Sequence, residues 1–214
     1  MKNIHQLISG SQKFQEKIFK KHQHKFVKLA TEGQSPKVLF IGCCDSRVLP
    51  NLITNTGPGD LFIVRNIGNF VAPYKPDEDF HSTAAAIEYA VSVLEVDDII
   101  VCGHSQCGAI SALYKESDSD DKEMKHVKKW LELGIPAKEF VQEHASEASE
   151  KDKYTMTEEI SVLFQLENLL TYPSVKRRVD NDELNLYGWH YDIESGEIFS
   201  YNDEMKEFLP LISE

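Results

Sequence analysis

Two short segments of the sequence combine soft metal ligands with charged side chains. One is CCDSR (43–47) and the other is HSQC (104–107). Each follows an apolar run of strand length, and open α/β sheets place their sites at the carboxyl ends of such strands. The two segments are therefore expected to meet in the fold, although 60 residues separate Cys43 from His104.

Metal ligation is the chemistry that these residue types favour. Cys43, His104 and Cys107 offer two sulfurs and one nitrogen to a single zinc ion. Three protein ligands are typical of a catalytic zinc site, and the fourth tetrahedral position is left for water or for Asp45. The sequence thus predicts a zinc site built from both segments.

Apolar periodicity predicts the elements that position these segments. Strands are expected at 38–44, 61–65 and 97–104, helices at 4–30, 84–96, 107–115 and 157–170, and a hairpin at 184–202 that turns at 194–196. Ser82 or Thr83 is expected to cap the second helix and Thr157 the last one. The acidic stretch 116–123 is interpreted as a solvated loop. Strands alternating with helices indicate a mainly parallel α/β sheet covered on both faces, and with no visible linker the chain is predicted to be one domain, 1–214.

Composition limits the classes of protein. With 23 Lys and Arg against 35 Asp and Glu, the net charge of −12 disfavours binding to the phosphates of a nucleic acid. The apolar runs are too short to cross a bilayer, and the polar start lacks the apolar core of a signal peptide. We therefore expect a protein that does not span a membrane and that lies in the cytoplasm. Four cysteines are too few for a disulfide scaffold. Cys102 is interpreted as a small buried hydrophobic residue, and Cys44 receives no role.

Five motifs extend this pattern over most of the chain. They are GCCDSRVLP (42–50), GDLFIVRNIGN (59–69), AIEYAV (86–91), CGHSQCGA (102–109) and LLTYP (169–173). With them the sequence resembles the β-class carbonic anhydrases. The resemblance implies a mostly parallel sheet of four to five strands flanked by helices, with an N-terminal helical arm (1–34), a zinc-binding core (35–214) and a C-terminal edge hairpin. It also implies an obligate homodimer that can assemble further into a tetramer or more, and the reversible hydration of carbon dioxide to bicarbonate and a proton.

The resemblance also assigns roles to individual residues. The zinc ligands, with one Zn²⁺ per chain, are Cys43, His104 and Cys107. The catalytic pair is Asp45 and Arg47. The substrate-binding positions are Gln34, Phe62, Ile67, Tyr89 and the backbone N–H of Gly108. In the family, the glutamine and part of the apolar wall reach the zinc of the neighbouring subunit.

One subgroup of the family is regulated by bicarbonate. It usually has a Trp where this chain has Phe40, and it lacks the glutamine that this chain has as Gln34. The chain therefore resembles the other, more readily active subgroup. Arg65 occurs in both subgroups and does not distinguish them.

These residue types suit the reaction. Zinc lowers the pKa of bound water from about 15.7 towards about 7, but two thiolates offset its charge, so water here should be less acidic than on a three-histidine zinc. Asp45, kept ionised and off the metal by a bidentate pair with Arg47, can accept a hydrogen bond and so aim the oxygen at the carbon. Gln34 can donate to the oxygen that becomes negative.

Other interpretations remain open at the level of the sequence. The zinc site can be a structural module closed by Asp45, or the same site can hydrolyse a molecule like carbon dioxide, such as carbonyl sulfide. A thiol–redox protein is the weakest alternative, because vicinal cysteines form strained disulfides. Asp45 and Arg47 can be a structural ion pair, and Gln34 a solvated loop residue. The three apolar wall positions can be ordinary core residues, and a histidine at position 81 can relay protons or simply lie on the surface.

Overall fold

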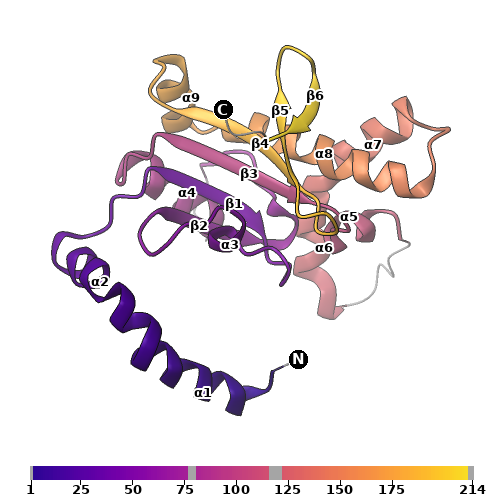
Figure 1. Ribbon diagram of the computed structural model, residues 1–214. Coiled ribbons are helices and arrows are strands. Elements are labelled where there is room, and N and C mark those ends of the chain that lie inside the picture. Colours follow the sequence, from indigo (N-terminus) through magenta and orange to yellow (C-terminus); the bar gives the residue numbers. More distant parts are fainter. Residues whose placement is uncertain (1, 77–80, 116–121, 212–214) are drawn as a thin grey trace.

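The computed structural model describes residues 2–76, 81–115 and 122–211 (Figure 1). A single six-stranded sheet runs through it in the order β2-β1-β3-β4-β5-β6. The strands are β1 Val38–Cys43, β2 Leu61–Asn66, β3 Asp98–His104, β4 Asn185–Tyr191, β5 Ile198–Asn202 and β6 Glu207–Pro210. The first four in this order are parallel and the last two antiparallel. The mostly parallel α/β fold with a C-terminal hairpin is confirmed, with one strand more than the four to five expected.

Helices connect and cover the strands. In the body they are α3 Pro50–Ile53, α4 Ser82–Ser92, α5 Gly108–Leu113, α6 Lys125–Leu131, α7 Ile135–His144, α8 Glu150–Leu169 and α9 Pro173–Asp180. Short 3-10 turns lie at Ile67–Asn69, Lys122–Met124 and Glu132–Gly134. No helix within the described parts of the chain is long and apolar enough to cross a membrane.

The main hydrophobic core lies between one face of the sheet and α4, α8 and α9. Alternate residues of β1 and β3 point into it and meet the apolar faces of these helices. Its buried members include Leu39, Ile41, Ile87, Val91, Ile99, Val101, Val162, Leu169 and Val175. Full burial of such a side chain stabilises the fold by about 1.5–3 kcal/mol, so this layer fixes β1 and β3 side by side.

The second face of the sheet carries a smaller cluster. Phe40, Ile100 and Cys102 are buried there, and Trp189 and Tyr191 of β4 are only partly buried. The rings of Phe40 and Trp189 meet edge to face, with centroids 6.4 Å apart. The interpretation of Cys102 as a buried hydrophobic residue agrees with its complete burial, which raises the pKa of its thiol to about 12.

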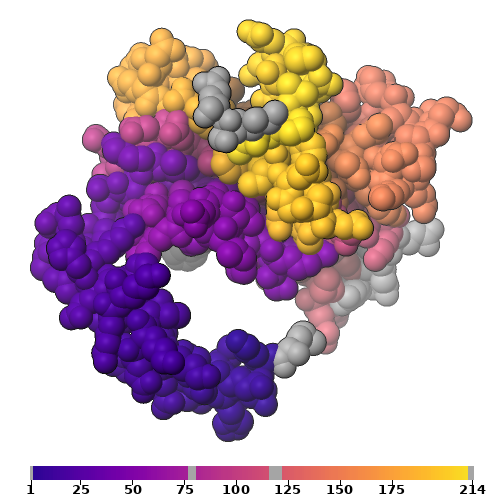
Figure 2. Space-filling model, viewed as in Figure 1, coloured from indigo at the N-terminus to yellow at the C-terminus, as the bar shows by residue number. Residues whose placement is uncertain are grey.

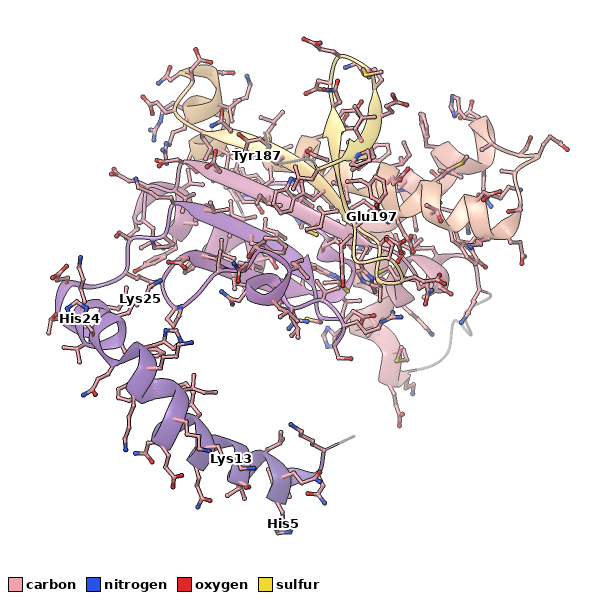
Figure 3. All side chains as sticks on the ribbon, viewed as in Figure 1. His5, Lys13, His24, Lys25, Tyr187 and Glu197 are labelled. Carbon is pink, nitrogen blue, oxygen red and sulfur yellow. The ribbon has the colours of Figure 1, made fainter. Side chains whose placement is uncertain are left out.

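The N-terminal arm is helical along its length and projects from the body. It consists of α1 Ile4–Lys13, a π-helical segment Phe14–Phe19 and α2 Lys20–Glu32, and no residue in it is buried. Figure 2 shows open space between the arm and the rest of the molecule. His5, Lys13 and His24 lie along the arm, whereas Lys25 forms an ion pair with Asp60 at 2.6 Å, which ties the base of the arm to the body (Figure 3).

Two predicted helix starts are wrong. The helix α4 begins at Ser82 with His81 as its N-cap residue, so neither Ser82 nor Thr83 is the cap, and it ends at Ser92 rather than near 96. The helix α8 begins seven residues before Thr157, because the Ser149 side chain accepts a hydrogen bond from the Asp152 N–H at 3.2 Å. Thr157 is instead a buried residue within this helix.

Part of the predicted acidic loop lies outside the described residues. Residues 116–121 fall there, and Lys122–Met124 form a 3-10 turn. The sequence patterns also did not predict α6, α7 or β6. These elements are short, and both α7 and β6 contain a proline, so none of them gives a clear apolar period.

Candidate active site

Three possible metal ligands meet at the carboxyl ends of two neighbouring strands. Cys43 is the last residue of β1, His104 is the last residue of β3, and Cys107 is the N-cap residue of α5. Their ligand atoms all lie within 4.8 Å of one another, and all three residues are buried. The expected convergence of the two segments is confirmed, and this group can hold a metal ion.

The orientation of the His104 ring tests whether the group fits zinc. Its Nδ1 lies 2.9 Å from the Ser105 carbonyl oxygen, which as an acceptor fixes the proton on Nδ1. Its Nε2 is buried and has no hydrogen-bond partner among the described residues. A buried nitrogen with a free lone pair beside two thiols is the donor set of a zinc site, so the residues present fit the ion.

The three groups shift one another's pKa values. A hydrogen bond from the Cys107 thiol lowers the pKa of Cys43 well below the ordinary value of a thiol, and the neighbouring His104 ring adds to this. The same bond to Cys43, followed by burial, raises the pKa of Cys107. Burial lowers the pKa of His104, but the negative charge of the adjacent Cys43 outweighs it and leaves this pKa raised. Negative charge therefore collects on Cys43 in a buried pocket, which favours a cation there.

Asp45 and Arg47 form a two-pronged ion pair directly after β1. The Arg47 Nε donates to Asp45 Oδ1 at 2.9 Å and its Nη2 donates to Oδ2 at 2.8 Å. The Arg47 backbone N–H also donates to Oδ1, at 2.9 Å. The hydrogen bond from Arg47 holds the pKa of Asp45 far below its usual range. The carboxylate is therefore ionised and oriented throughout the neutral pH range.

Two further residues, which the sequence did not single out for a role, hold this loop. Gln106 accepts Arg47 Nη1 on its side-chain oxygen at 3.2 Å and Nη2 on its backbone oxygen at 3.1 Å. Arg65 donates to the carbonyl oxygens of Cys43 and Asp45, at 2.9 and 2.7 Å. The sequence position of Gln106, between His104 and Cys107, was the available signal for a role at the site. Its contact with Arg47, however, depends on a left-handed backbone with φ of 57°, which the sequence pattern does not show.

Ile67 and Gly108 lie on the same side of the molecule as the ligand group. Ile67 directly follows Asn66, the residue of β2 that is in register with Cys43, and the residue is 44% exposed. Its carbonyl oxygen accepts the indole N–H of Trp130 at 2.7 Å. Gly108 is the first residue of α5, where a backbone N–H has no partner within the helix.

Gln34, Phe62 and Tyr89 lie at the other end of the strands. Phe62 is in register with Leu39 near the start of β1, and its ring centroid lies 5.9 Å from that of Tyr89 on α4. Gln34 is exposed and precedes β1 by four residues. Roughly 15 Å of strand separates this end from Cys43. Within one chain, the structure does not bring these three residues to the ligand group.

Comparisons with known proteins agree with this fold and site. A family model described as carbonic anhydrase matches residues 38–198. The carbonic anhydrase of Pseudomonas aeruginosa is 42% identical over 207 residues, which cover 96% of this chain and 90% of that protein. The carbonic anhydrase of Helicobacter pylori strain J99 is 39% identical over 204 residues, covering 94% of this chain and 92% of that protein.

Solved structures extend the similarity to the whole fold. The β-carbonic anhydrase CcaA has a TM-score of 0.91 and 40% identity, covering 98% of this chain and 92% of that one. A tetrameric β-carbonic anhydrase from the ascomycete Sordaria macrospora has a TM-score of 0.79 and 29% identity, covering 92% of this chain and 95% of that one. The predicted resemblance is confirmed: the chain belongs to the β-carbonic anhydrase family, and it is an enzyme that reversibly hydrates carbon dioxide to bicarbonate.

Proposed function

We propose that Cys43, His104 and Cys107 hold one zinc ion per chain and that carbon dioxide is hydrated beside it. The observation that carries this proposal is the buried, unpartnered Nε2 of His104 within 4.8 Å of two cysteine sulfurs. Zinc bound there would lower the pKa of a water molecule and so supply hydroxide close to neutral pH.

Asp45 is the residue that orients the nucleophile. Its carboxylate is an ionised acceptor held by three hydrogen bonds from Arg47, so it can take a hydrogen bond from the attacking oxygen and turn a lone pair towards the carbon. Arg47 also keeps Asp45 away from the metal, because both carboxylate oxygens are engaged by its guanidinium. Pre-positioned groups of this kind need no reorganisation during the reaction.

The substrate pocket joins residues of two copies of the chain. Ile67 and the backbone N–H of Gly108 serve carbon dioxide in the copy that holds the metal. Gln34, Phe62 and Tyr89, too far along the strands to reach their own metal, complete the pocket of a second copy. Gln34 donates its amide N–H to the oxygen that becomes negative, and the rings supply an apolar wall.

Assembly of the copies draws on the arm. Residues 1–34 hold seven lysines against two glutamates, a formal charge of +5, and because the whole chain carries −12 this leaves −17 on residues 35–214. The arm also exposes Ile4, Leu7 and Ile8. A basic arm with an apolar side suits the acidic body of another copy. The assembly is a homodimer that can pair into a tetramer, each chain being one domain with an arm (1–34) and a core (35–214).

The compartment follows from the cysteines. All four are free thiols, and two of them are proposed zinc ligands. Thiols persist in reducing surroundings, so the cytoplasm is the proposed location, with carbon dioxide and bicarbonate as small-molecule partners and no membrane or nucleic acid.

Light scattering is expected to give the mass of a dimer or of a multiple of it. A second experiment, the mixing of two variants, tests whether each pocket is shared between two copies of the chain. Gln34→Ala and Asp45→Asn each impair every site of their own dimers. In mixed dimers, one site combines the intact Asp45 of one chain with the intact Gln34 of the other. Co-refolding the two is therefore expected to restore up to a quarter of wild-type sites, by random pairing. Asp45→Asn refolded by itself provides the control, because no intact site can form in it. A fully active monomer, or a mixture that recovers no activity, would contradict a shared pocket.

Activity is expected to rise gradually from about pH 7 towards pH 9, because two thiolates offset the zinc charge and delay ionisation of its water. Arg47 lowers the folded-state pKa of Asp45, so Asp45 stays ionised above its unfolded value of about 3.9 and loses this state only in strong acid. It therefore adds no inflection in this range. The slope of log kcat/KM against pH should stay near one, with or without bicarbonate. A slope well above one with sigmoidal bicarbonate inhibition would mean that Asp45 closes onto the metal.

A further inference from the structure

A buried carboxylate stands behind the metal-ligand loop and has no part in the mechanism above. Glu158 of α8 is only 4% exposed. Its Oε1 accepts the backbone N–H of Cys107 at 2.9 Å, and its Oε2 lies 3.4 Å from Nε2 of His190 on β4. Removing a carboxylate from water is costly unless its oxygens are engaged, so a role at this place is indicated.

Two glycines bring α8 close enough for this contact. A Cβ at Gly103 of β3 would lie 2.8 Å from a Val162 methyl group, and one at Gly188 of β4 would lie 3.0 Å from the other. The helix therefore packs directly on the backbone of both strands around Val162. This places Glu158, one turn earlier, next to the loop that joins β3 to α5.

The same helix holds a second loop, the one that follows β2, by the same kind of contact. Gln165 of α8 accepts the backbone N–H of Val71 at 2.8 Å, and Asn168 donates to the Val71 carbonyl oxygen at 2.9 Å. Glu158, Ser161 and Gln165 are all buried, so the inner side of α8 is polar where it meets these loops. A buried polar side chain directed at a loop backbone fixes that loop in one position.

We infer that Glu158 is a positioning residue: it fixes the backbone of Cys107, and through it the cysteine sulfur, for binding the metal. This rests on the zinc site proposed above. Both Cys107 and Glu158 are buried, so losing this contact while the space stays filled leaves the Cys107 N–H without a partner. Residues that orient metal ligands typically change metal affinity 10- to 100-fold when replaced.

Two substitutions separate the contact from the charge. Glu158→Gln keeps an oxygen at the same reach and removes the charge, whereas Glu158→Asp keeps the charge and withdraws the oxygen by one methylene. Glu158→Leu keeps the volume and removes both. Glu159→Leu, at the adjacent half-buried carboxylate, is the matched control.

The experiment measures zinc dissociation constants by competition with a chromophoric chelator, together with the Tm of each metal-free protein. Glu158→Gln is expected to bind zinc within about 3-fold of the wild type, and Glu158→Asp and Glu158→Leu at least 10-fold more weakly. The metal-free Tm of Glu158→Asp should lie below that of Glu158→Gln, because the Asp variant leaves the buried Cys107 N–H without a partner, so zinc affinities are compared at a temperature where both metal-free variants are folded. Equal zinc affinities in the Asp and Gln variants, or a weaker Gln than Asp variant, would overturn the inference.

Failure of the zinc site itself is recognised separately. A wild-type protein that binds no zinc would contradict the proposed function, whatever the variants do. A wild-type protein that binds zinc, with Glu159→Leu losing as much affinity as Glu158→Leu, would overturn only the role of Glu158. If Glu158→Leu does not fold, the comparison between the Gln and Asp variants still decides.

Discussion

Cys107→Ala is expected to lose both the metal ion and the hydration of carbon dioxide. Two of the three buried ligand residues are thiols, and each change to alanine leaves one sulfur and one nitrogen. If a zinc-binding free energy of about 10 kcal/mol is shared by three ligands, one ligand is worth about 3 kcal/mol, or on the order of 10²-fold in affinity. Cys43→Ala is expected to behave alike, because Cys43 carries the thiol whose pKa is lowered.

The control for these variants is Cys44→Ala. Cys44 adjoins Cys43 but is exposed and outside the ligand group, so this variant should keep its zinc and its activity. Zinc per chain, measured by mass spectrometry, and stopped-flow hydration rates on the same samples provide the readouts. Full zinc retention in both Cys43→Ala and Cys107→Ala would remove the proposed site.

Asp45→Asn is expected to keep zinc and to lower kcat by roughly 10²- to 10³-fold, the usual effect of losing one pre-positioned polar group. Asparagine is uncharged, and its amide nitrogen is a donor where the carboxylate has an acceptor. Arg47→Ala should lower the rate too, because it frees Asp45 to reach the metal. Arg47→Lys keeps the charge but loses the planar guanidinium that engages both oxygens of Asp45. Its hydration rate should therefore lie between those of the wild type and of Arg47→Ala.

The matched control is Asp203→Asn, at an exposed carboxylate that pairs with Lys206 on the surface. It should retain both zinc and turnover. Near-normal turnover in Asp45→Asn with zinc bound would show that the pair with Arg47 is structural. The alternative of a structural zinc module requires Asp45 as the fourth ligand, and in this structure both oxygens of Asp45 are engaged by Arg47.

The sheet and the ligand group could be predicted because their signals are local. The runs that form β1, β2 and β3 are apolar, have strand length and are bounded by turn residues, and each observed strand differs from the predicted one by a single residue at one end. Parallel strands then place their carboxyl ends together, which was enough to bring Cys43 near His104.

Other elements escaped prediction because their signals are weak or lie elsewhere. The first two turns of α8 are polar, and the helix start is set by Ser149 and Asp152, outside the apolar pattern. The strand β6 is four residues long and ends in a proline at the sheet edge, where a missing N–H costs no ladder bond. Packing rather than periodicity decides such elements.

The contacts of the site also divide into those with a local sequence signal and those that depend on packing. The pairing of Asp45 with Arg47 follows from adjacency in sequence, whereas Gln106 reaches Arg47 only through a left-handed backbone. Glu158 reaches Cys107 only because two glycines let a helix approach the sheet. Contacts of this kind depend on the assembled fold and leave no pattern in the sequence.

The central claim is that this chain hydrates carbon dioxide through zinc held by Cys43, His104 and Cys107. Its most direct test is stopped-flow hydration measured at increasing zinc occupancy, from stripped to fully reloaded protein at pH 8.5, near the upper end of the expected rise from about pH 7 to pH 9. The rate should grow in proportion to bound zinc and level off at about one ion per chain. A rate that stays constant as zinc is removed and restored, or that is absent at full occupancy, would contradict the claim.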